Sequence, residues 1–194
     1  MRSEPSERAP RNARPRNGSP SQPGFRLDGV DLRILSLLQT DARMSSADLA
    51  REVALSPPGV QKRLRKLEER GVIERYATII QREAIGLDLL CIVQVSLAHH
   101  EPRIVEGFRE AVRAMPEVLE CHYLTGEFDY LLKVVVANHQ HLEQFLFEKL
   151  TRSKGVDKIR TSIVLNEIKH STSLPLGSWD HDGERWVGAK DSNR

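Results

Sequence analysis

The sequence predicts an α+β protein that consists of a winged helix-turn-helix domain followed by a ferredoxin-like domain. Between residues 27 and 80 the apolar side chains recur at the spacing of helices, whereas from Leu89 onward strand-like runs alternate with helical ones. The order of the later elements, β-α-β-β-α-β, is that of the ferredoxin-like fold. We therefore expect two domains within the 194 residues, at 27–80 and 81–170.

Two short helices begin the first domain. Asp28 and Asp31 form a cap-like start for the first helix. Its apolar residues share one helical face: Val30, Ile34, Leu37 and Leu38. The pattern Ser45-x-x-Asp48 then predicts the start of a second helix, because its side chains can satisfy the free N–H groups of a first turn.

A third helix is expected from Ser56, an N-cap residue, to Gly71, which can supply a left-handed turn. Pro57 suits the first helical position because its missing donor costs nothing there. At 100° per residue from Val60 the buried stripe continues to Leu67, and a basic face points outward. With the preceding helix and tight turn, this face indicates a helix-turn-helix that enters the major groove of double-stranded DNA.

The outward face predicts which side chains meet the DNA. Gln61 and Arg65 suit base edges, because amide and guanidinium groups pair bidentately, whereas Lys62 and Lys66 suit phosphates. Residues 72–79 are a predicted strand and connector, from which Arg75 reaches a phosphate. The full expected set is Ser56, Pro58, Gln61, Lys62, Arg63, Arg65, Lys66 and Arg75. The alternative to DNA binding is that this basic face only contacts solvent.

The second domain is predicted from its alternating periodicities. We expect strands at 89–97, 118–124, 130–136 and 156–168, and helices at 103–115 and 141–150. The stretch Thr125-Gly126-Glu127-Phe128-Asp129 is short enough to be a hairpin loop. A sheet of this topology carries helices on one face only, so we expect dimerisation to cover the other face.

Outside the domains, composition limits the classes of protein. Residues 1–26 hold six Arg against two Glu, and we expect a disordered basic tail there, which either adds weak phosphate contacts or has no task. Residues 171–194 are a polar tail in which Trp179 and Trp186 are candidates to dock on a domain. The longest apolar run, residues 89–93, is far below the roughly 20 residues of a membrane span, so we expect a cytoplasmic protein without membrane contact. Cys91 and Cys121 are expected to be buried thiols, and no metal or cofactor is expected.

Three stretches of the chain together carry the markers of one known family. They are Leu27-Asp28-x3-Leu32-x-Ile34-Leu35-x2-Leu38-Gln39-x-Asp41-x-Arg43, Leu55-Ser56-Pro57-x2-Val60-x2-Arg63-Leu64-x2-Leu67-Glu68-x2-Gly71-Val72-Ile73 and Glu120-Cys121-His122-x-Leu124-Thr125-Gly126-x-Phe128-Asp129-Tyr130-Leu131-Leu132-Lys133. In these stretches the chain resembles the Lrp/AsnC, or feast/famine, regulators of bacteria and archaea, from about residue 27 to 168.

This resemblance implies a sequence-specific DNA-binding transcriptional regulator, not an enzyme, whose oligomeric state or DNA affinity responds to an amino acid or related metabolite. Homodimers of such proteins assemble into tetramers or octamers, and the effector binds between dimers near the hairpin. The implied effector residues are Leu124, Thr125, Gly126, Phe128, Asp129, Tyr130, His139, Ser162 and Ile163. The Asp129 carboxylate suits an ammonium group, and the N–H groups of a glycine loop suit a carboxylate. Alternatively, Asp129 only closes the hairpin.

The chain departs from the family pattern in several places, and two other functions are alternatives. Ala54 stands where the family often has glycine in the motif's turn, and Ser153-Lys154 replaces an apolar residue and a proline. A sirohaem-decarboxylase-like enzyme is one alternative, but its Asn-Leu-Trp-Phe-like run is absent. A DNA-independent sensing module is the other, and the basic helix disfavours it. His139-x-His141 is a poor half of a metal site, because two rings at this spacing diverge.

Overall fold

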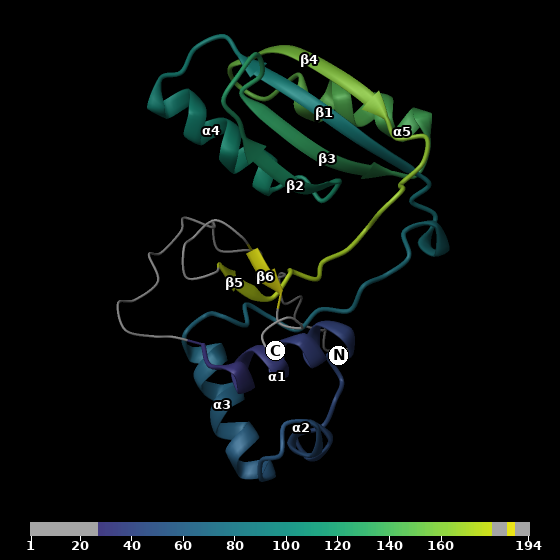
Figure 1. Ribbon diagram of the computed structural model, residues 1–194. Coiled ribbons are helices and arrows are strands. Elements are labelled where there is room, and N and C mark those ends of the chain that lie inside the picture. The colour runs from purple at the N-terminus through teal and green to yellow at the C-terminus, as the bar shows by residue number, and fades with distance from the viewer. Residues whose placement is uncertain (1–26, 180–185, 189–194) are drawn as a thin grey trace, which may run out of the picture. The chain divides into compact units, whose positions relative to one another are not determined.

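The computed structural model describes residues 27–179 and 186–188, so the predicted basic tail at 1–26 lies outside the described part of the chain. The chain divides into two compact units, coloured from purple to yellow along the sequence in Figure 1. The helical unit comprises the described residues up to Tyr76 together with those from Thr172 onward. The sheet unit is Ala77–Ser171.

Helices build the first part of the helical unit: α1 (Gly29–Thr40), α2 (Ser46–Glu52) and α3 (Pro57–Glu69). All three begin at their predicted caps. The backbone N–H of Asp31 donates to the Asp28 carboxylate at 2.8 Å, and the N–H of Asp28 donates to Asp31 in return. Ser45 and Ser56 each accept the N–H three residues later. These bonds satisfy donors that a helix start leaves free, and they explain why the sequence located the starts.

The predicted strand at 72–79 is wrong. After Gly71, whose φ is 69° as predicted, the backbone crosses residues 72–80 without strand structure. A strand needs a neighbour for its hydrogen bonds, and among the described residues none forms a ladder with this segment. The two-stranded sheet of the helical unit is instead β5 (Gly177–Trp179) paired antiparallel with β6 (Trp186–Gly188).

The sheet unit has the predicted ferredoxin-like topology. In chain order its strands are β1 (Leu89–Leu97), β2 (Val118–Tyr123), β3 (Tyr130–Val136) and β4 (Val156–Ile163). The sheet order is β2-β3-β1-β4 and all neighbours are antiparallel. Its helical segments are the 3₁₀ turn η1 (Glu83–Ile85), α4 (Pro102–Arg113), α5 (His139–Gln144) and the π-helical turn η2 (Phe145–Leu150) that continues α5.

Both helices of the sheet unit pack on the same face of the sheet. Phe108 of α4 and Phe145 at the end of α5 are fully buried in one apolar cluster with strand residues such as Val93 and Leu132. The last strand ends at Ile163 rather than at the predicted residue 168. Val164 still donates its N–H to the Leu90 carbonyl at 2.8 Å, but β1 begins at Leu89, so the chain from Leu165 onward has no strand beside it among the described residues.

The two cysteines differ from each other. Cys91 is buried on β1 as expected, and burial raises the pKa of its thiol. Cys121 lies on the edge strand β2 and is exposed as a residue, so the expectation that both would be buried is wrong for this position. Burial of its thiol nevertheless raises the pKa to about 11. Both thiols are therefore protonated and unreactive at neutral pH.

Candidate nucleic-acid interface and effector site

The third helix presents a polar face to solvent. Val60 and Leu67 are buried on its inner side, in the two apolar clusters that join it to α1 and α2. The predicted DNA-contacting residues at its exposed positions are Ser56, Pro58, Gln61, Lys62, Arg65 and Lys66. Ser56 also has a structural task, since its hydroxyl accepts the N–H of Gly59 at 3.3 Å. The side chains predicted to contact base edges and those predicted to contact phosphates are therefore exposed along the same helix.

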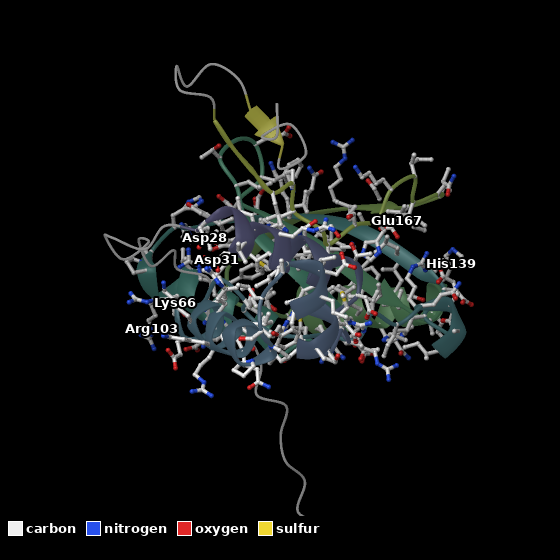
Figure 2. All side chains as sticks on the ribbon, turned by 60° about the horizontal axis from the view of Figure 1, so that its bottom comes forward. Asp28, Asp31, Lys66, Arg103, His139 and Glu167 are labelled. Carbon is white, nitrogen blue, oxygen red and sulfur yellow. The ribbon has the colours of Figure 1, made fainter. Side chains whose placement is uncertain are left out.

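Residues 62–66, Lys-Arg-Leu-Arg-Lys, form a basic run on α3. Arg63 is placed differently from the other basic residues of this run. Its guanidinium donates to the carboxylates of Asp28 and Asp31, each at 2.7 Å, and the Asp31 side chain is only 7% exposed. The two aspartates lie close together at the start of α1 (Figure 2). The N–H of Asp31 and the Arg63 guanidinium both lower the pKa of Asp28. Arg63 thus fastens α3 to α1, and the expectation that it reaches DNA is not supported.

The turn between α2 and α3 has an unusual backbone. Ala54 has a φ of 52°, the single positive value among the described residues other than glycine. The neighbouring Leu55 N–H donates to the Ala50 carbonyl at 3.0 Å, which ends α2. Glycine adopts this conformation without steric cost, so the turn explains why a glycine is common at this position in the resembling family.

Beyond α3 the chain is tied back to the helix. The Tyr76 hydroxyl donates to the Glu68 carboxylate at 2.9 Å. Burial and this carboxylate raise the pKa of Tyr76 to about 12, so the hydroxyl remains a donor at neutral pH. Arg75, the last predicted DNA-contacting residue, is exposed beside it.

The hairpin between β2 and β3 is organised by Asp129. One carboxylate oxygen accepts the N–H of Leu97 at 2.7 Å, and the other lies 2.6 Å from His100 Nε2. Burial raises the pKa of Asp129, but the Leu97 N–H and His100 outweigh it, and the pKa lies below the usual value. Gly126 has a φ of 133°, which the hairpin requires and other residues rarely adopt. The backbone carbonyl of Asp129 accepts the N–H of Leu124 at 2.8 Å across the hairpin, whereas its carboxylate ties the hairpin to Leu97 at the end of β1 and to the exposed His100.

The other predicted effector residues do not gather around Asp129 in one chain. His139 opens α5 beyond the far end of β3, whose seven residues span about 20 Å. Ser162 and Ile163 lie on β4, and β1 separates that strand from β3. Tyr130 is 1% exposed and its ring packs against Phe108 with centroids 4.7 Å apart, so it is a core residue. Those that flank Asp129 are Leu124, Thr125, Gly126 and Phe128.

A cavity of about 420 Å³ lies on the open side of the sheet, and the sequence reasoning missed it. Its lining includes Leu90 and Val135 of the sheet, residues 79–83 and Glu167. The Lys133 ammonium lies between two carboxylates, 3.6 Å from Glu120 and 3.7 Å from Glu167. No local sequence pattern predicts this cavity, because the residues that line it come from segments far apart in the sequence.

His141 does not pair with His139. Its Nε2 lies 3.3 Å from the Glu117 carboxylate, which also accepts from the Lys149 ammonium and is only 7% exposed. Its Nδ1 accepts the Ala137 N–H at 3.3 Å, so Nε2 carries the proton of the neutral ring. In the described part of the chain no group of His, Cys, Asp and Glu is arranged to hold a metal ion, and no helix could cross a membrane.

Comparison with known proteins gives two family models. A winged helix-turn-helix DNA-binding model matches residues 27–74, and a model of the Lrp/AsnC ligand binding domain matches residues 90–174. Among curated proteins, the leucine-responsive regulatory protein of Haemophilus influenzae is 38% identical over 150 residues, 77% of this chain and 90% of that protein. The protein of the same name from Escherichia coli K12 is 38% identical over 158 residues, 81% of this chain and 96% of that one.

Solved structures agree with these matches. The complex of transcriptional regulator NMB0573 from Neisseria meningitidis with L-Met has a TM-score of 0.74 and 39% identity, and the alignment covers 77% of this chain and 97% of that one. An AsnC family transcriptional regulator from Agrobacterium tumefaciens has a TM-score of 0.73 and 31% identity, with the same coverages. Both domains of the chain are thus matched, in sequence and in fold.

Proposed function

The chain belongs to the Lrp/AsnC family of DNA-binding transcriptional regulators, and we propose that α3 reads the operator while the sheet unit binds an amino acid between two copies of the chain. The exposed basic face of α3 carries the first part. Gln61 and Arg65 contact base edges, and Lys62, Lys66 and Arg75 contact phosphates. Ser56 and Pro58 lie at the N-terminal end of this helix, where the backbone approaches the duplex.

Charge reversal tests the DNA-reading helix. The double variant Lys62→Glu/Arg65→Glu should weaken binding to a selected duplex more than a hundredfold, because a bidentate base contact contributes about 1–3 kcal/mol and a phosphate contact is lost as well. The slope of log affinity against log salt should also fall by about one, because Lys62 is the phosphate contact of the pair. Arg152→Glu/Lys154→Glu, at two exposed positions of the sheet unit, makes the same change in net charge and serves as the control. Unchanged affinity of the first variant, in an intact oligomer, would refute the assignment.

The amino-acid effector is supported by the L-Met complex of the Neisseria relative and by the chemistry of the hairpin. Asp129 offers a carboxylate to an ammonium group, which would replace His100 at one oxygen while the Leu97 N–H keeps the other. The loop around Gly126 offers N–H groups to the ligand's carboxylate. Because His139, Ser162 and Ile163 lie away from this hairpin in one chain, they complete the site from a second copy.

A thermal-shift screen of the twenty amino acids and the branched-chain keto acids tests the effector site. A ligand at a hundred times its Kd should stabilise the protein by about 2.7 kcal/mol. Asp129→Asn retains an oxygen for the Leu97 N–H but not the charge, so it should lose the response to amino acids. Asp157→Asn, at an exposed position at the start of β4, is the control and should keep the response. A response that survives Asp129→Asn would exclude the proposed role of this carboxylate.

Oligomerisation is part of the same proposal. A site completed by a second copy requires at least a homodimer, and the apolar residues exposed near the open side of the sheet suit such an interface. Further assembly into tetramers or octamers would place several α3 helices along one duplex. A regulator of this kind works in the cytoplasm, where the DNA is.

A further inference from the structure

The chain returns to the helical unit after it leaves the sheet unit. We call residues 172–176 the C-terminal strap. The Gln39 side-chain amide on α1 donates from Nε2 to the Leu174 carbonyl at 3.1 Å, and its Oε1 accepts the Leu174 N–H at 2.6 Å. One side chain thus satisfies both backbone groups of a residue 135 positions away, as a neighbouring strand would.

The end of the strap is anchored in the core of the helical unit. Leu176 packs against the cluster of Ile34, Leu35 and Leu67. Leu67 belongs to α3, so the strap touches the same core that seats the DNA-reading helix. By contrast, Leu174 is 71% exposed, and it contacts α1 through its backbone hydrogen bonds.

Both chain segments that join the two units are therefore fastened to the helical unit. The first segment leaves α3 and is held where the Tyr76 hydroxyl donates to Glu68. The second follows β4, crosses residues 164–171 and is held on α1 by Gln39. A unit tethered at two points samples fewer orientations than a unit on a single flexible linker.

We propose that the strap is a positioning element of DNA recognition, in which Gln39 and Leu176 hold the second connection so that α3 is presented to the duplex in a restricted range of orientations. If release of the strap reduces the binding-competent fraction to a tenth, the apparent operator affinity falls tenfold.

Two variants that break the same contact from opposite sides test this proposal. Leu174→Pro removes the N–H that donates to Gln39, and Gln39→Ala removes the side chain that accepts it. Leu174→Ala is the matched control, because it changes the exposed side chain and retains both hydrogen bonds. Binding to the duplex selected with the parent protein is followed by fluorescence anisotropy at 10 °C over a range of salt concentrations, with folding checked by circular dichroism.

We expect Leu174→Pro and Gln39→Ala each to weaken binding about tenfold with an unchanged salt slope, and Leu174→Ala to match the parent. Hydrogen exchange of the peptide that contains the strap should be faster in Gln39→Ala. Parent-like affinity in either contact-breaking variant overturns the proposal, even if the melting temperature falls, since the contact then adds only stability. A slope reduced by about one also overturns it, because the strap would then contact phosphate itself. Failure of the parent to bind any duplex would instead refute DNA reading.

Discussion

At the scale of single residues, Arg63 is predicted to act through stability. Its guanidinium is the partner of the buried Asp31 carboxylate, and removal of one member of such a pair leaves an uncompensated charge. Arg63→Ala should lower the free energy of unfolding by about 2 kcal/mol. Urea unfolding measures this, with Lys62→Ala as the exposed neighbour, which should stay within about 0.5 kcal/mol of the parent. Equal stability of both variants would show that the ion pairs with α1 contribute little.

The difference between Arg63 and Arg65 shows how much the basic sequence of α3 could predict about its DNA-facing side chains. The run indicated a DNA-binding helix, but it did not tell which members point outward. Helical geometry held a partial signal: at 100° per residue, Arg63 lies about 60° from Val60, at the edge of the buried stripe. Its partners on α1 are more than thirty positions earlier in the chain. That contact depends on tertiary packing, which periodicity alone does not contain.

Glu117 is predicted to make the sheet unit sensitive to acid. Burial raises the pKa of this carboxyl, but Lys149 and His141 outweigh burial, and its pKa in the folded protein lies below the usual 4.5. The folded state then binds fewer protons than the unfolded state, so this stabilisation is complete above about pH 4.5 and is lost as the pH falls through the folded pKa. Glu117→Gln should therefore be less stable than the parent at pH 7 and lose less stability between pH 5 and 3. Urea midpoints across this range test the difference, and parallel curves for both proteins would contradict it.

At the scale of elements, the turn between α2 and α3 is predicted to be strained. Ala54 is held at a φ of 52°, where its Cβ crowds the backbone. Ala54→Gly should therefore raise the free energy of unfolding by about 1 kcal/mol and leave operator affinity unchanged. Ala50→Gly, within α2, is the opposite control, because glycine in a helix interior costs about 1 kcal/mol. Thermal denaturation of the pair decides the matter: destabilisation by Ala54→Gly would mean that Ala54 contributes packing rather than strain.

Elements fixed by local chemistry could be predicted, and elements fixed by a distant partner could not. Each helix of the helical unit carries its own cap, and the ferredoxin-like order follows from alternating periods in the sequence. The expected strand at 72–79 has the right residues but no described neighbour to pair with. β4 ends at Ile163 because its partner β1 begins at Leu89, and only Val164 beyond Ile163 still bonds to β1 through its backbone. No sequence pattern predicts the strap either, since its contact with Gln39 uses backbone groups that almost every residue has.

At the scale of the whole molecule, the predicted effector residues form one site only if copies of the chain associate. Leu165 and Ile168 follow β4 and are 97% and 87% exposed. Contact with a partner would remove this apolar surface from water. In an isologous dimer each substitution acts twice, so Leu165→Lys/Ile168→Lys should shift the protein from oligomer to monomer. Light scattering coupled to gel filtration measures the mass.

The matched control for this double variant is Phe147→Lys. Phe147 is 65% exposed and lies on the π-helical turn, on the side of the sheet that the helices cover. It should leave the mass unchanged, since exposed apolar area alone does not define an interface. A monomeric Leu165→Lys/Ile168→Lys variant should also lose the thermal response to amino acids, because His139, Ser162 and Ile163 of a second copy no longer reach the hairpin around Asp129. A monomer that still responds would mean that one chain holds the effector alone, for which the cavity beside Lys133 is then the candidate.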